Sequence, residues 1–203
     1  MRIIHIYSYW VIPLLEQKEI YILLTDTGTW LSQMIKMYTR EPLNHVSIAF
    51  DRKLTEVYSF GRKDPANPFI GGFVREQIYG SLIRSSHRPT LCALYKITVT
   101  QDVYDRIRRR IRMIEQHKDE YRYNLIGLLG IVFRVRIERE NAYFCSQFVA
   151  SVLQYSGCDL FQKQSEWVTP EDFRQCARLQ LVYKGDLKDA AAQYHPSELM
   201  RLA

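Results

Sequence analysis

The sequence predicts an α+β fold in which an antiparallel sheet packs against helices, within one chain of 203 residues. Three observations indicate this: short apolar runs bounded by turn residues, one long amphipathic helix in the middle, and two shorter helix starts after it. The chain is 47% hydrophobic, which is enough apolar material for a full core. Since no repeat or low-complexity linker divides it, we expect a single domain over 1–203, with 1–17 as an N-terminal arm and 186–203 as a peripheral tail.

The first part of the chain predicts three strands and a helix. Glu19–Leu24 is a run of residues that favour strands, and Trp30–Tyr38 carries apolar side chains at helical spacing. His45–Phe50 alternates apolar and polar residues, as in a strand with one buried face. After a turn at 51–53, Leu54–Phe60 is expected to return as the second strand of a hairpin.

The middle of the chain predicts a loop, a strand and a helix. Residues 61–72 are rich in Gly and Pro and indicate an ordered surface loop beside a site. Leu91–Val99 is typical of a strand, and Leu125–Phe133 is a short, very apolar segment. Asp102–His117 predicts an amphipathic helix, because its apolar residues recur at helical spacing: Val103, Ile107, Ile111 and Ile114.

The C-terminal part predicts two more helices and a last strand. The apolar residues between Phe144 and Leu153 recur at helical spacing and predict a helix that ends at Ser156-Gly157. Thr169–Asp172 is a helix start, with Thr as the N-cap, Pro at the first helical position and an acid at the third. Leu179–Tyr183 is expected to form the last strand.

The net charge of +6 suggests a nucleic-acid partner, mainly because of an arginine-rich run at 106–112. Between Gln101 and Glu120, however, six Lys or Arg residues face five Asp or Glu residues. Binding of a polyanion requires a surface of one sign. The run therefore predicts the solvated face of the amphipathic helix, and we expect no nucleic-acid partner.

The apolar stretch Ile3–Leu15 predicts a strand or a packed arm rather than a membrane anchor. It is shorter than the roughly 20 apolar residues of a membrane span. Pro13 interrupts it, and Glu16 follows without a small-residue cleavage site. We expect no stable membrane span and a cytoplasmic location, with export left open as the alternative.

The cysteines predict neither a metal site nor a disulfide framework. They form no CxxC pair and no Cys/His cluster with zinc-ligand spacing, so no metal and no cofactor is expected; they are Cys92, Cys145, Cys158 and Cys176. Cys145 differs from the others because it falls in the first turn of a predicted helix. There, unpaired N–H groups and the helix dipole stabilise a thiolate and can receive an oxyanion. The alternative is a buried small hydrophobe, an interpretation that suits Cys92 and Cys176 better.

His45 is the candidate base for such a thiolate. It opens an alternating strand on the face opposite Val46, Ile48 and Phe50. A thiol nucleophile needs an imidazole within reach to accept and return a proton. The alternative is a structural histidine at a strand entrance. The other histidines lie in less suitable places, namely the arm, a loop, a helix end and the tail: His5, His87, His117 and His195.

Taken together, these motifs resemble a known family. A His opens a strand hairpin early in the chain, a Tyr123–Gly127 segment lies upstream of the Cys, and Cys145-Ser-x-Phe-Val149 starts a helix about a hundred residues after the His. This resembles the circularly permuted papain-like cysteine hydrolases of the NlpC type, close to YiiX/YebB-like bacterial proteins and more distantly the lecithin–retinol acyltransferases. The resemblance covers roughly 21–183 and implies a permuted papain-like fold.

The resemblance also implies a third polar residue, on the strand after the His strand, that orients the imidazole. If the hairpin is tight about Arg52, Ser59 lies opposite His45. Glu56 is the only acid on that strand, although alternation places it on the other face. Both stay candidates. Tyr123 and Tyr143 are candidate substrate-contacting residues of the cleft, with core or rim positions as the alternative.

The function implied by the resemblance is hydrolysis of an amide or ester bond through a thioester on Cys145, with His45 as base. The implied substrates are peptides, cell-wall-like amides or lipid-like acyl compounds. Two alternatives stay open: an acyltransferase that uses the same pair, and a catalytically silent interaction module on the same fold. The sequence leaves the oligomeric state open.

Overall fold

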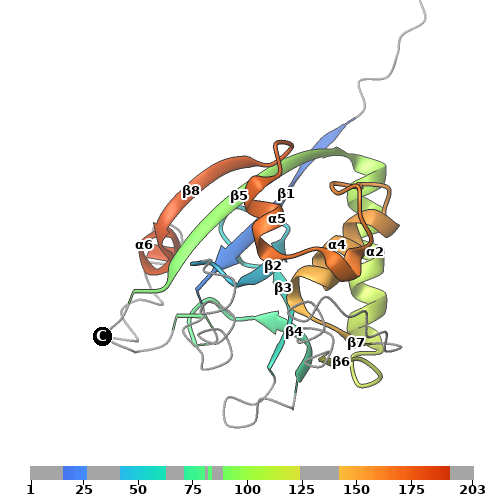
Figure 1. The fold of residues 1–203 in the computed structure, drawn as a ribbon, viewed down its shortest axis with the longest axis horizontal. Helices are drawn as coiled ribbons and strands as arrows, with labels where there is room; N and C mark the ends of the chain where they lie inside the picture. The colour runs from blue at the N-terminus through green and yellow to red at the C-terminus, as the bar shows by residue number, and fades with distance from the viewer. Residues whose placement is uncertain are drawn as a thin grey trace, which may run out of the picture.

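The computed structural model describes residues 16–26, 42–62, 71–80, 82–83, 89–123 and 142–192, and its centre is a six-stranded antiparallel sheet (Figure 1). The sheet contains β1 (Gln17–Thr25), β2 (His45–Ala49), β3 (Val57–Arg62), β4 (Gly71–Glu76), β5 (Leu91–Thr100) and β8 (Gln180–Asp186). A parallel pair, β6 (Arg122–Tyr123) and β7 (Ala142–Tyr143), forms a separate small sheet. The helices are α2 (Gln101–Gln116), α4 (Cys145–Tyr155), η1 (Ser165–Trp167), α5 (Pro170–Gln175) and α6 (Leu187–Ala192). The expected α+β class, with an antiparallel sheet and helices, is confirmed.

The strand order β4-β3-β2-β1-β5-β8 places β1 and β2 in the middle of the sheet. The run of residues in β1 that favour strands is buried over most of its length, as a central strand requires. Thr25, the last residue of β1, lies opposite His45 on β2 and opposite Cys92 on β5. Because β2 begins where β1 ends, His45 stands at one end of the sheet.

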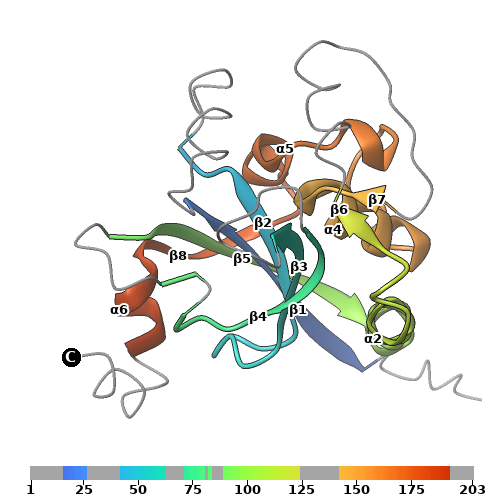
Figure 2. The same ribbon diagram turned by 90° about the horizontal axis from the view of Figure 1, so that it is seen from below.

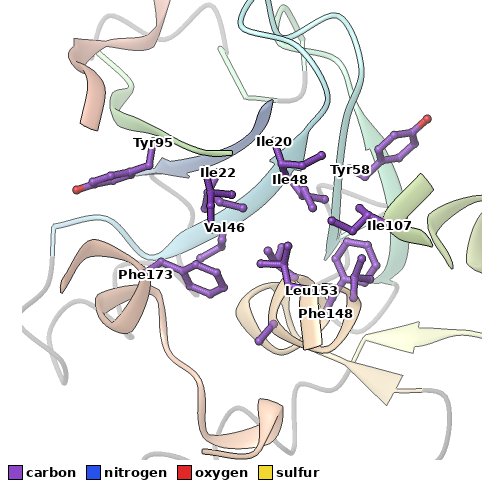
Figure 3. Close-up of a cluster of buried hydrophobic side chains, with 14 of the residues drawn as sticks. Ile20, Ile22, Val46, Ile48, Tyr58, Tyr95, Ile107, Phe148, Leu153 and Phe173 are labelled. Carbon is purple, nitrogen blue, oxygen red and sulfur yellow. The ribbon is translucent and has the colours of Figure 1, made fainter. Parts of the chain in front are cut away.

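The larger hydrophobic cluster, here called the main core, lies between one face of the sheet and the helices α2, α4 and α5. Figure 3 shows strand residues such as Ile22, Val46 and Ile48 facing the α4 residues Phe148 and Leu153. A second cluster covers the other face, where Leu187 and Ala191 of α6 join residues of the central strands. Figure 2 shows α6 on the side of the sheet away from α4 and α5.

Strand β2 is buried on both faces, which corrects the prediction of a half-buried strand. Val46 and Ile48 belong to the main core, and Ala49 belongs to the second cluster. The polar position between them, Ser47, is fully buried. The predicted strand is confirmed. The face predicted to be exposed to solvent is instead covered by the second cluster, which includes Leu82 and residues of α6.

Helix α2 is the amphipathic helix predicted from the isoleucine spacing. Its N-cap Thr100 accepts a hydrogen bond from the Val103 N–H at 3.4 Å. Its isoleucines are buried: Ile107, Ile111 and Ile114. Two of its arginines contact distant parts of the chain: Arg106 donates to the Ser156 carbonyl at 2.9 Å, and Arg108 forms an ion pair with Glu56.

Both predicted C-terminal helix starts are present. Helix α4 begins at Cys145, and α5 begins at Pro170. The backbone N–H and the hydroxyl of Thr169 each donate to Asp172 Oδ2 at 2.7 Å, which accounts for the start of α5. The last strand, β8, is also where the sequence placed it, with three additional residues at its C-terminal end.

Other expectations need correction or lie outside the described residues. The predicted loop at 61–72 begins and ends in strand, because β3 extends to Arg62 and β4 begins at Gly71. Leu187, at the start of the predicted peripheral tail, is fully buried against the sheet. The predicted helix at 30–38, the apolar segment 125–133 and the arm up to residue 15 lie outside the described residues. Within the described ranges, no helix is both long and apolar enough to cross a membrane.

Replacing Leu153 by alanine should lower the free energy of unfolding by about 2–5 kcal/mol, because it leaves a cavity between α4 and the sheet. Leu153 is 1% exposed and belongs to the main core. Gln154→Ala, at an exposed position on the same helix, is the control and should change stability by less than about 0.5 kcal/mol. Chemical denaturation measures both variants. Equal losses would contradict this account of the core.

Candidate active site

Cys145 is the first residue of α4, and two hydrogen bonds of its neighbours hold the helix start in place. The side-chain oxygen of Gln147 accepts the Phe144 N–H at 3.4 Å, and the Ser146 hydroxyl donates to the Val168 carbonyl at 2.6 Å. Phe144 is extended, so the chain enters the helix from a strand-like conformation. The first N–H groups of an α-helix have no partner within it, so they surround the Cys145 side chain with donors.

The Cys145 sulfur lies where the start of α4 meets the start of β2. The side chain of Cys145 is in hydrogen-bond contact with His45, and its sulfur receives backbone N–H groups of Val46 and Ser146. Its Sγ is 3.9 Å from the Asn44 carbonyl oxygen. Cys145 is only 6% exposed. The two residues predicted as nucleophile and base are therefore brought together, although they are far apart in the sequence.

His45 forms a contact with each of its two ring nitrogens. Its Nε2 lies 3.1 Å from Glu76 Oε1, and its side chain is also in hydrogen-bond contact with Cys145, for which we infer that Nδ1 is the ring atom used. The side chains are 12% exposed for His45 and 7% for Glu76. A carboxylate on one nitrogen and a thiol on the other fix the ring orientation.

Glu76 is the site residue that the sequence analysis missed. It is the last residue of β4, a strand that was not predicted, because the Gly- and Pro-rich segment before it indicated a loop. Its Oε1 also accepts a hydrogen bond of 2.6 Å from the Ser59 hydroxyl. The segment Gly71–Glu76 pairs along its whole length with β3, so reading it as a third hairpin strand would have placed an acid beside the site.

The predicted register of the β2–β3 hairpin is wrong by two residues. Ala49 pairs with Val57, and continuing this pairing sets Ser59 opposite Ser47 and Gly61 opposite His45. The connection from 50 to 56 is longer than the expected tight turn, and Leu54 within it has a φ of 60°. Ser59 consequently donates to the carboxylate instead of accepting the imidazole N–H.

Gly61 leaves the space beside His45 free of a side chain. A Cβ at this position would lie 3.8 Å from His45 Cε1, 3.8 Å from Ser59 Oγ and 4.0 Å from Glu76 Oε1. All three are ordinary contact distances. The site residues on β2, β3 and β4 therefore converge around this one glycine.

Glu56, the other candidate for orienting the imidazole, is engaged elsewhere. Both of its carboxylate oxygens lie 3.1 Å from Arg108 Nη2, and Oε1 accepts the Tyr58 hydroxyl at 2.8 Å. These contacts connect the end of the β2–β3 turn to α2. The acid that contacts His45 is Glu76.

The two candidate tyrosines lie on the small parallel sheet, where Tyr123 and Tyr143 are paired in register. The ring of Tyr143 packs at 5.2 Å from Phe60 and stacks on Tyr121 at 6.1 Å, at the edge of the main core. The Tyr123 side chain lies outside the described part of the structure. The substrate contacts expected of both residues stay predictions.

The environment favours a charged Cys145–His45 pair. Burial alone lowers the pKa of His45, but its hydrogen bonds to Cys145 and Glu76 and their negative charges raise it to about 10. Burial raises the pKa of Cys145, yet the hydrogen bond and charge of His45, with the two backbone N–H groups, lower it below its ordinary value. By contrast, burial raises the pKa of Cys92 to about 12 and also raises that of Cys158.

Among the described residues, no group of three or more His, Cys, Asp or Glu side chains could hold a metal ion. Comparison of the sequence with family models and with curated proteins gave no match. The interpretation of the site therefore depends on the geometry and charges of this chain.

Iodoacetamide should label Cys145 faster than the other cysteines at about pH 6.5, because His45 and two backbone N–H groups stabilise the Cys145 thiolate. The His45→Ala variant should lose most of this advantage. Mapping of the labelled peptides by mass spectrometry measures the rate at each cysteine. Buried Cys92 and Cys158 are internal references for inert thiols.

His117→Ala is the matched control for this experiment, because His117 lies at the exposed end of α2 and contacts the Met113 carbonyl. Its labelling pattern should equal that of the wild type. Slow labelling of Cys145 in the wild type, unchanged in His45→Ala, would contradict an activated pair.

Proposed function

We propose that this protein is a cysteine hydrolase that cleaves an amide or ester bond through a thioester on Cys145. The observation that carries the proposal is the chain of contacts from Cys145 to His45 to Glu76, with Cys145 at the start of an 11-residue helix. A buried thiol, an imidazole in contact with it and a carboxylate on the other ring nitrogen are the components of nucleophilic catalysis by cysteine.

In the proposed first half-reaction, the Cys145 thiolate attacks the carbonyl carbon and forms a carbon–sulfur bond. The carbonyl electron pair moves to oxygen, where backbone N–H groups of the first turn of α4 are available as donors. The intermediate collapses, and the bond to the leaving group breaks as the leaving group takes the proton of the His45 imidazolium. A thioester and neutral His45 result.

In the second half-reaction, His45 removes a proton from water, and the resulting hydroxide attacks the thioester carbonyl. Collapse releases the carboxylic acid and restores the thiolate and the imidazolium. Glu76 stabilises the imidazolium and keeps Nδ1 directed at the sulfur, because its carboxylate holds Nε2. No cofactor is required for this cycle.

The fold supports the same proposal. The base lies on a strand that precedes the helix of the nucleophile, and an antiparallel sheet packs against that helix. This arrangement is the one expected for circularly permuted papain-like hydrolases of the NlpC type, in which the His comes before the Cys. We propose that fold, with peptide, cell-wall-like amide or lipid-like acyl compounds as the class of substrate.

A 4-nitrophenyl ester should acylate Cys145 and give a protein whose mass increases by that of the acyl group. Hydroxylamine should release the group, since thioesters react readily with it. Cys145→Ala should abolish the adduct, and His45→Ala should slow its formation by about a thousandfold or more. Gln154→Ala, at an exposed position of α4, should behave as the wild type.

Mass spectrometry and nitrophenolate release measure both steps of this reaction. An adduct that water removes slowly but an added amine or alcohol removes quickly would favour the acyltransferase alternative. The absence of any adduct on folded protein would contradict both enzymatic proposals and leave an interaction module.

Turnover should be highest between two pH limits. Below the lowered pKa of Cys145 the thiol is protonated, so activity falls as the pH decreases. Above the raised pKa of His45, about 10, the imidazolium that protonates the leaving group is lost, so activity falls as the pH increases. Glu76→Gln removes a negative charge that raises the pKa of His45, and it should therefore move the alkaline limit to lower pH.

Glu56→Gln is the control for this shift, since Glu56 is engaged by Arg108 and Tyr58. Its alkaline limit should match that of the wild type. If Glu56→Gln moved the limit and Glu76→Gln did not, the assignment of Glu76 would be contradicted. The pH dependence of kcat/KM for an amide substrate, whose leaving amine must be protonated, measures both.

A further inference from the structure

One carboxylate oxygen at the site receives two hydrogen-bond donors. Oε1 of Glu76 lies 3.1 Å from His45 Nε2 and accepts the Ser59 hydroxyl at 2.6 Å. Ser59 is fully buried, in the middle of β3. The shorter of the two contacts is the one made by Ser59.

We propose that Ser59 is a positioning residue, whose hydroxyl holds the Glu76 carboxylate in the ionised form and orientation that receive the His45 N–H. This inference rests on the proposed function, because it assigns a role within the Cys145–His45–Glu76 chain. It places a fourth polar side chain in the site.

The conformational argument begins with the difference between the two side chains. Glu76 is the last residue of β4, an edge strand of the sheet, and its side chain has three rotatable bonds. Ser59 lies on β3, which is paired on both sides. A single rotatable bond sets the position of its side-chain oxygen. A donor on the rigid strand thus restrains an acceptor on the more mobile side chain.

The electrostatic argument concerns burial of the carboxylate. A buried carboxylate is unfavourable unless hydrogen bonds satisfy it, and a donor that bonds the charged form favours ionisation. Glu76 is 7% exposed, so the Ser59 hydroxyl acts on a group that has lost most of its water. With the charge of Glu76 stabilised, the imidazolium of His45 is stabilised, and through it the thiolate of Cys145.

A buried serine can also be merely structural, and Ser47 allows the two roles to be separated. Ser47 is fully buried on the neighbouring strand, and its hydroxyl has no hydrogen-bond partner within the described part of the chain. Continued from the observed pairs, the register sets it directly opposite Ser59. Ser47→Ala therefore measures the general effect of removing a buried hydroxyl next to the site.

The experiment compares the full-length wild type with Ser59→Ala, Ser59→Thr, Ser59→Val and Ser47→Ala. Threonine and valine have nearly the same shape, so this pair tests the hydroxyl without a change of volume and keeps the test available if Ser59→Ala fails to fold. The measurement is the rate of Cys145 alkylation by iodoacetamide as a function of pH, with peptide mapping. Thermal unfolding of each variant is measured alongside.

In the Ser59→Ala and Ser59→Val variants, the pH midpoint of alkylation should rise by about one unit, so that the rate at pH values below the wild-type midpoint falls roughly tenfold. Ser59→Thr and Ser47→Ala should keep the wild-type midpoint, whatever their unfolding temperature. A purely structural role would change the unfolding temperature and leave the midpoint in place.

If Ser59→Val and Ser59→Thr share one midpoint, or if Ser47→Ala shifts as far as Ser59→Ala, the role of Ser59 is overturned and the proposed function stands. If Cys145 of the wild type reacts no faster than the partly exposed Cys176, the activated pair itself is overturned. The two failures are therefore distinguishable in one data set.

Discussion

The packing of α4 against β2 fixes the relative positions of the polar residues at the site. Phe148 and Val149 are fully buried in the main core with Val46, and they lie one helical turn after Cys145. Val46 in turn directly follows His45. Close packing of these apolar side chains leaves one arrangement of the helix on the sheet, and that arrangement brings the sulfur to the imidazole. Apolar contacts between α4 and β2 therefore position the thiol of Cys145 and the imidazole of His45.

Electrostatically, the site works only as a set of mutually compensating groups. Taking a thiolate or an imidazolium out of water is unfavourable for each ion alone. Here the ions are paired with each other, Glu76 balances the imidazolium on its other side, and backbone N–H groups of Val46 and Ser146 reach the sulfur. Removing any one member leaves a buried charge without compensation, because both side chains are largely out of water, with His45 12% exposed and Glu76 7% exposed.

Local signals in the sequence were sufficient to select Cys145 and His45, the proposed nucleophile and base, which are in contact in the structure. A helix start marked Cys145, and strict alternation marked the strand of His45. The orienting acid was not accessible in the same way, for two physical reasons. A register shift of two residues keeps every side chain on its face, so alternation cannot detect it, and the conformation around Leu54 decided the pairing. Glu76 also follows a Gly- and Pro-rich segment, whose composition indicates a loop and gives no sign that the sheet continues with β4.

The members of the site are unevenly distributed along the chain. His45 and Glu76 are 31 residues apart, on β2 and β4 of one three-stranded antiparallel segment, whereas the sulfur of Cys145 contacts a residue 101 positions earlier. Closing short loops costs less entropy than closing long ones, so the imidazole–carboxylate half forms from local contacts and the thiol joins through a long-range one. A nascent or partly folded chain thus carries an ordinary, weakly reactive cysteine. In the proposed mechanism, the reactivity of Cys145 therefore depends on the finished domain, since a chain that has not yet brought His45 to the thiol would undergo acylation and oxidation only slowly.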